Sequence, residues 1–129
     1  DPLRVARAQL SLSNAHSVAG DPVKALSYAT KAANTARTAS DTKLESMALF
    51  AVGNIYAGLG AIAYAERTLN RVLNLTKEID DRHGQNMANA ALANVYLMRG
   101  EVDKAEAQYQ QVIDFAPKRI VRMRSFLHD

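Results

Sequence analysis

The amino-acid sequence repeats itself with a period of 40 residues. Gly20, Gly60 and Gly100 lie 40 residues apart, and the residues around them recur at the same offsets. The recurring columns include Ala25, Ala65 and Ala105, five residues after each glycine, and Asn14, Asn54 and Asn94, six residues before it. Self-similarity at a fixed period of this length is typical of chains that stack one supersecondary unit several times. The 129 residues therefore hold three copies of one unit, within the size of a single domain.

Each unit is predicted to be a helix, a turn and a second helix. Apolar residues between the glycines recur at helical spacing, as in Leu92, Val95 and Tyr96, and not in alternation. Asp1-Pro2 and Asp21-Pro22 each place an acceptor side chain at a helix cap and a proline at the first helical position. The glycines suit the tight turn after a first helix, because glycine tolerates a positive φ. The expected first helices are 3–18, 43–58 and 83–99, the expected second helices are 22–38, 62–79 and 102–115, and a last helix is expected at 118–127.

Small residues at fixed positions predict a close contact between the two helices of each unit. Ser13, Gly53 and Ala93 occupy one column of the first helices, and the recurring alanines occupy one column of the second helices. We expect Ala65 and Ala105 to be buried where the two helices of their units cross. Hydrophobic residues make up 48% of the chain, as in ordinary globular proteins, so a core can form around these crossings.

The third unit resembles the tetratricopeptide repeat. The residues that carry the resemblance are Leu92, Ala93, Tyr96, Gly100, Ala105, Tyr109, Val112 and Pro117, and residues 52–75 match nearly as well. The resemblance implies an all-α fold, a right-handed α-solenoid of three helical hairpins plus a C-terminal capping helix. The hairpins would be residues 6–45, 46–85 and 86–117, followed by a C-terminal helix at 118–129. We expect one domain that is a fragment of a larger protein.

Two features depart from the commonest form of this repeat. The large aromatic residue usual near the start of the first helix is replaced by Gln9, Leu49 and Asn89. The period is 40 residues, whereas about 34 is commoner in the family. Longer second helices and the segment from Leu75 to Gly84 resemble a subclass found in spindle-orientation adaptors, kinesin light chains and bacterial regulators that sense peptides or sugars.

The resemblance also implies which residues face a partner, because the first helices of such arrays line a concave groove. Asparagine is neither a strong helix former nor a core residue, and in this family the asparagine column faces the groove, where an amide can bond a ligand's backbone. The alternative is a structural amide that links neighbouring units. The expected groove residues are Arg7, Asn14, Met47, Phe50, Asn54, Met87, Asn94, Leu97 and Met98. Methionine and phenylalanine there favour the apolar side chains of a bound helix or extended segment.

The segment 118–124 carries the one local excess of positive charge. Lys118, Arg119, Arg122 and Arg124 lie opposite Ile120, Met123 and Leu127 on a predicted helix. We expect the apolar side to cap the open end of the third unit, because a bare end of a solenoid promotes aggregation. The alternative is a basic surface for an acidic partner, RNA or lipid. Nucleic acid is disfavoured, because no aromatic residues lie between the cations to stack on bases.

Other motifs are better explained by the repeat than by chemistry. Residues 47–65 are long and apolar enough to suggest a membrane span, but they are rich in alanine and glycine and align with polar segments of the other units. The glycines at 58 and 60 imitate a dinucleotide fingerprint without its flanking strands. His16, His83 and His128 lack partners at metal-ligand spacing, and adjacent Asp80 and Asp81 suit helix capping better than acid–base catalysis.

These observations favour an interaction module over an enzyme. The chain has no cysteine, which excludes disulfide scaffolds and thiol catalysis and fits a reducing, cytoplasmic setting. A net charge of +3 is too small to require an anionic partner. We therefore expect a scaffold or adaptor that binds another protein or peptide segment in its groove, with no catalytic residues, no cofactor and no metal. The alternative is a sensor domain of a signalling or transcriptional regulator that binds a peptide or small ligand.

Overall fold

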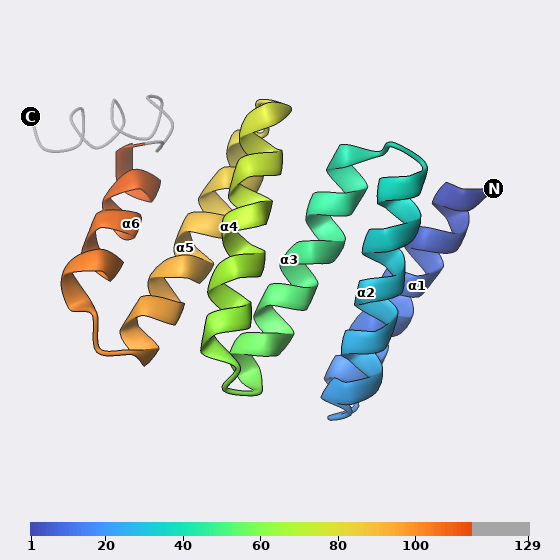
Figure 1. Cartoon of the computed structure of the whole chain (residues 1–129), viewed down its shortest axis with the longest axis horizontal. Helices are drawn as coiled ribbons and strands as arrows, with labels where there is room; N and C mark the ends of the chain where they lie inside the picture. The colour runs from blue at the N-terminus through green and yellow to red at the C-terminus, as the bar shows by residue number, and fades with distance from the viewer. Residues whose placement is uncertain (115–129) are drawn as a thin grey trace, which may run out of the picture.

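A computed structural model of the chain describes residues 1–114 as six α-helices joined by short turns (Figure 1). The helices are α1 Pro2–Val18, α2 Pro22–Thr38, α3 Thr42–Gly58, α4 Ile62–Glu78, α5 Arg82–Met98 and α6 Val102–Asp114. The predicted helices through residue 114 are confirmed to within one residue at nearly every end. The expected last helix at 118–127, with its capping role, lies outside the described residues.

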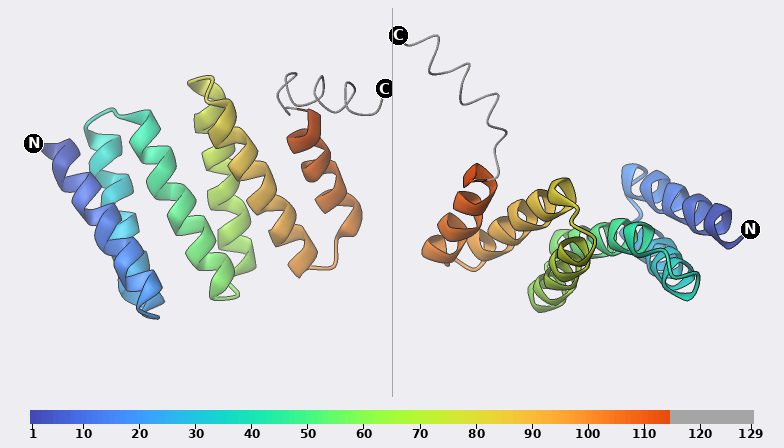
Figure 2. Two further views of the ribbon diagram at one scale, coloured as in Figure 1. Left: turned by 180° about the vertical axis from the view of Figure 1, so that it is seen from behind. Right: turned by 90° about the horizontal axis from the view of Figure 1, so that it is seen from above.

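The helices form an α-solenoid of stacked helical hairpins. Each helix packs mainly against its neighbours in sequence, and α3 also makes lighter contacts with α1 and with α5. Seen from behind, α1 lies in front of α2 and α5 lies in front of α4, with α3 between these two pairs (Figure 2, left). The first helices thus share one face, and that face carries the predicted groove residues. No helix of the described part combines the length and the apolar character needed to cross a membrane.

The helices of a unit are equally long in the first two units. Helices α1 to α4 each have 17 residues, so the two helices of a unit share the 40-residue period equally. The turns within and between units are alike as well. A residue with positive φ stands at every twentieth position, namely Gly20, Ser40, Gly60, Asp80 and Gly100.

Aspartate side chains begin four of the helices. Asp1, Asp21, Asp41 and Asp81 each accept a hydrogen bond from a backbone N–H of the first turn. Such a cap stabilises a helix by about 1 kcal/mol. The predicted caps at Asp1, Asp21 and Asp81 are confirmed, whereas α4 begins after Ala61, which makes no side-chain cap.

The predicted close crossings are confirmed by burial. Ala25, Ala65 and Ala105 are all buried. In the first unit the Ser13 hydroxyl donates a 2.7 Å hydrogen bond to the backbone carbonyl of Ala25, which ties α1 directly to α2. These crossings fix the angle between the two layers and therefore the shape of the face formed by α1, α3 and α5.

Candidate partner-binding groove

A groove of about 850 Å³ runs across the face formed by α1, α3 and the beginning of α5. Its floor includes Val72 and Thr76, which reach it from α4 in the second layer and are buried. Small residues at Ser13, Ser46 and Gly84 line the same hollow. Because these residues have short side chains, they leave room for a ligand in the groove.

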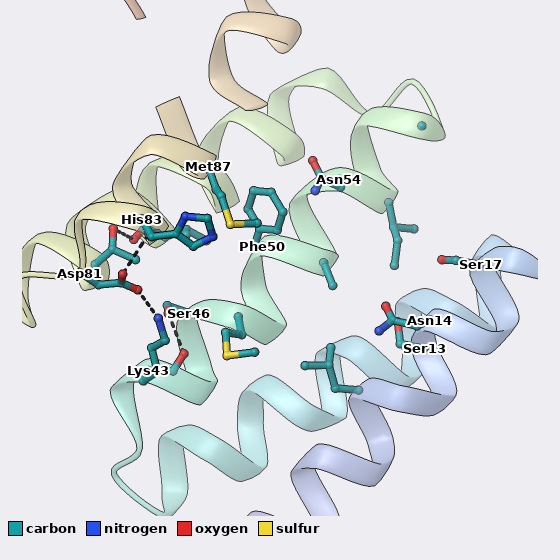
Figure 3. Close-up of a pocket in the computed structure, with 18 of the residues that line it drawn as sticks. Ser13, Asn14, Ser17, Lys43, Ser46, Phe50, Asn54, Asp81, His83 and Met87 are labelled. Atoms are coloured by element: carbon teal, nitrogen blue, oxygen red, sulfur yellow. Dashed lines mark hydrogen bonds and ion pairs between the residues drawn. The ribbon is translucent and has the colours of Figure 1, made fainter. Parts of the chain in front are cut away.

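Two of the recurring asparagines lie in this groove. Asn14 on α1 and Asn54 on α3 line it (Figure 3), and both are exposed. Asn94 on α5 is exposed as well but does not line the groove. Within residues 1–114, none of the three side chains makes a hydrogen bond. Their amides are therefore available to a partner.

The apolar part of the groove centres on Met47, Phe50 and Met87, all three among the predicted residues. Met47 is 47% exposed although its side chain is large and apolar. Phe50 is different, because it is half-buried and packs against the core cluster formed by Ala65, Leu69, Leu92 and Val95. Phe50 thus lines the groove and also packs against the core, whereas Met47 lies mainly on the surface.

An ion pair marks the end of the groove nearest the beginnings of α3 and α5. Lys43 Nζ lies 2.5 Å from Asp81 Oδ2, and the Lys43 side chain is 54% exposed while that of Asp81 is 14% exposed. Asp81 Oδ1 also accepts the backbone N–H of Gly84 at 3.0 Å. The hydrogen bond from Lys43, and then that from Gly84, hold the pKa of Asp81 below its ordinary value. The carboxylate therefore joins two first helices and caps one of them (Figure 3).

A smaller hollow of about 320 Å³ adjoins this end. It shares Leu10, Asn14, Lys43 and Met47 with the larger groove, so the two form one continuous surface. Arg7 on α1, a predicted groove residue, lies in this smaller hollow.

The remaining predicted residues lie apart from both hollows. Leu97 and Met98 are exposed near the end of α5, as is Asn94 one turn earlier, and none of them lines the groove or the smaller hollow. The groove meets α5 near its beginning, at His83, Gly84 and Met87, so the second half of that helix lies outside it.

The polar end of the groove was missed by the sequence interpretation. Lys43 and His83 occupy the same column of the repeat, and each precedes a predicted groove methionine by four residues. Residues four apart share one face of a helix. This spacing was the signal that could have identified both residues.

Across residues 1–114, no group of three or more histidine, aspartate or glutamate side chains is arranged to hold a metal ion. The polar end of the groove holds one aspartate, one lysine and one histidine, a set suited to binding charged or hydrogen-bonding groups of a partner.

Comparison with known proteins supports the architecture. No protein-family model and no curated protein matches the sequence. Among solved structures, the crystal structure of the TPR domain of Arabidopsis FLU superimposes with a TM-score of 0.83 at 22% sequence identity. The match covers 88% of this chain and 96% of that one. The chain therefore has the fold of a TPR-like helical repeat.

Proposed function

We propose that this domain is a protein-interaction module that binds a segment of a partner protein in the groove across α1, α3 and α5. The observation that carries the proposal is the pair of exposed amides, Asn14 and Asn54, that line the groove and form no side-chain hydrogen bond with any residue of 1–114. An asparagine amide can both donate and accept hydrogen bonds, as a peptide backbone requires.

The apolar side chains of the same groove support a protein partner. Met47 and Met87 expose large flexible side chains beside the two amides. Methionine adapts its shape to different apolar side chains, and exposed apolar patches rimmed by polar groups are typical of interaction sites. A partner segment would bury its apolar side chains on the methionines and bond its backbone to the amides. We place the module in a scaffold or adaptor of the cytoplasm, with no catalytic activity of its own.

The test compares capture of partner proteins by the unaltered domain with capture by Asn54→Ala and Met47→Ala variants, each checked for its melting temperature. Removing a hydrogen-bonding amide from a partly desolvated contact costs about 1–3 kcal/mol, or roughly tenfold to a hundredfold in affinity. We expect specific partners, identified by mass spectrometry, to be lost from both variants while melting stays near native.

Lys104→Ala on α6 is the matched surface control. Lys104 is exposed, pairs with Glu101 three residues away, lies 5.8 Å from the centre of the Tyr96 ring, and is on a second helix outside the groove. Exposed pairs of this kind contribute little to stability. If the groove variants and the control retain the same partners, the groove is not the binding surface.

A second candidate function is supported by the size of the groove. A volume of about 850 Å³ lies within the range of small-ligand sites, roughly 300–1,000 Å³. A sensor for a small ligand would be stabilised by that ligand through mass action. A thermal-shift screen of metabolites and short peptides separates the two functions, because a scaffold gains stability only from peptides and a small-ligand sensor gains it from metabolites as well.

A further inference from the structure

We propose that the partner segment carries an acidic side chain close to a large apolar one. The acid would lie between Arg7 and Lys43 in the smaller hollow, and the apolar side chain would lie on Met47 and Met87. This inference rests on the proposed function, since it names the chemistry of the segment that the groove binds.

Arg7 is the first reason. Its side chain lines the smaller hollow, is exposed, and forms no ion pair with any residue of 1–114. The other cation of this hollow, Lys43, already pairs with Asp81. A guanidinium offers a rigid fork of donors that matches the two oxygens of a carboxylate.

Lys43 is the second reason, because it lines both hollows and shares the smaller one with Arg7. One of its ammonium hydrogens bonds Asp81, and an ammonium group has three donors, so Lys43 can bond a second carboxylate without releasing the first. More than half of its side chain is exposed, which leaves that second carboxylate an approach.

The carboxylates already present at this end form hydrogen bonds within the protein. Asp81 bonds both Lys43 and the N–H of Gly84, and Asp41, which lines the smaller hollow, accepts the N–H of Leu44 at 2.9 Å. Both begin a helix, and a helix N-terminus favours negative charge near it. One further carboxylate would therefore find an unpaired guanidinium and a shareable ammonium.

The apolar neighbour of that acid follows from the residues that the two hollows share. Met47 lines both, and Leu10 lies beside it. Because the surface is continuous, a segment that places an acid against Arg7 places the next residues over Met47 and then toward Met87. Large apolar side chains such as Leu, Met or Phe would bury the most apolar area there.

The experiment is a selection of displayed random 12-residue peptides on the unaltered chain, on Arg7→Glu and on Arg4→Glu. Arg4 is an exposed arginine on the same helix that lines neither hollow, which makes it the matched control. We expect peptides that pair Asp or Glu with a nearby Leu, Met or Phe to be enriched by the unaltered chain and by Arg4→Glu. On Arg7→Glu the acidic preference should vanish or reverse, and a selected acidic peptide should bind roughly tenfold more weakly.

The outcomes separate this inference from the proposed function. Selected peptides that lose binding in Asn54→Ala and Met47→Ala, yet show no acidic preference and no response to Arg7→Glu, would overturn the acidic partner and leave the groove as the binding site. Selected peptides that bind all groove variants equally, or no enrichment at all, would overturn the groove function and with it this inference. Melting curves of each variant ensure that only folded protein is compared.

Discussion

A Cβ atom at Gly53 in α3 would lie 2.8 Å from both Cγ and Cδ2 of Leu69 in α4. Leu69 is completely buried, so its side chain cannot shift into solvent to make room. The two helices approach one another here more closely than any side chain at Gly53 permits. The same two columns hold Ser13 with Ala29 in the first unit, where a larger residue on the first helix faces a smaller one on the second.

Substitution of Gly53 by alanine should therefore destabilise the domain, although alanine is the better helix former. Forcing an extra methyl group into a packed contact costs about 1–3 kcal/mol. The measurement is the free energy of unfolding in urea. Gly58→Ala is the control, because Gly58 lies on the same helix with nothing within 4 Å of an added Cβ, and it should be neutral or stabilise by up to about 1 kcal/mol. Equal effects of the two changes would show that the close crossing is not real.

A second prediction concerns Ala65, which is buried where α3 and α4 cross. Leucine at this position should lower the unfolding free energy by about 1–3 kcal/mol or prevent folding. Ala63→Leu, on the exposed side of the same helix, should change it by no more than about 0.5 kcal/mol. Thermal melting monitored by circular dichroism measures both, and an unaltered melting temperature of Ala65→Leu would contradict the register of the hairpin.

Most of the fold could be predicted from the sequence because every element occurs three times. Three glycines at a fixed spacing mark one type of turn, and the aspartates mark helix starts. The equivalence of the other turns could not be predicted, since Ser40 and Asp80 stand where glycine would be expected. Positive φ is uncommon for residues other than glycine, and at these two positions the surrounding helix ends impose it.

The C-terminal segment supplies a third prediction. Its alternation of basic and apolar residues favours a cap on the third unit, so removal of residues 118–129 should lower the melting temperature and the solubility. We expect these losses to be the main effect of the truncation, with little change in affinity for nucleic acid. A truncated chain that melts as before but loses salt-dependent RNA or DNA binding would identify the basic residues as a functional surface instead.

The pair of Lys43 and Asp81 predicts a pH-dependent contribution to stability. The pKa of Asp81 is lowered in the folded state, so its contribution is present above its ordinary value of 3.8 and is lost as the pH falls through the folded-state pKa. Asp81→Asn keeps a capping side chain but removes the charge. We expect it to lose about 0.5–1 kcal/mol at pH 7, with the difference from the unaltered chain narrowing under acidic conditions.

Asp41→Asn is the matched control for that measurement. Asp41 caps α3 in the same way as Asp81 caps α5, but it forms no ion pair among the described residues. Its substitution should have a smaller effect at pH 7. If both variants lose the same stability at every pH, the Lys43 pair contributes nothing beyond the cap.

The groove could be predicted only in part. Helical register identifies the columns that share the first-helix face, and Asn14, Met47, Phe50, Asn54 and Met87 do line the groove. The depth of the groove could not be predicted, because it depends on which side chains beneath the face are short. Helical register also gives no information on where the groove ends along a helix. The predicted set of groove residues therefore included Asn94, Leu97 and Met98. Register does not show that Phe50 also packs on the core, and because of that packing its truncation should lower stability as well as binding.

Substitution of the asparagine column distinguishes its two possible roles, which are binding a partner and linking neighbouring units. Replacing Asn14, Asn54 and Asn94 together by alanine should raise the unfolding free energy by about 1–2 kcal/mol in total, because alanine is the better helix former at exposed positions. Partner capture should fall at the same time. Asn70→Ala with Asn74→Ala, two exposed asparagines on α4, is the control that should gain stability without loss of capture. If the triple variant melts well below the unaltered chain, the amides link neighbouring units. A stabilised variant that no longer binds would show that these positions are kept polar for a partner at the expense of stability.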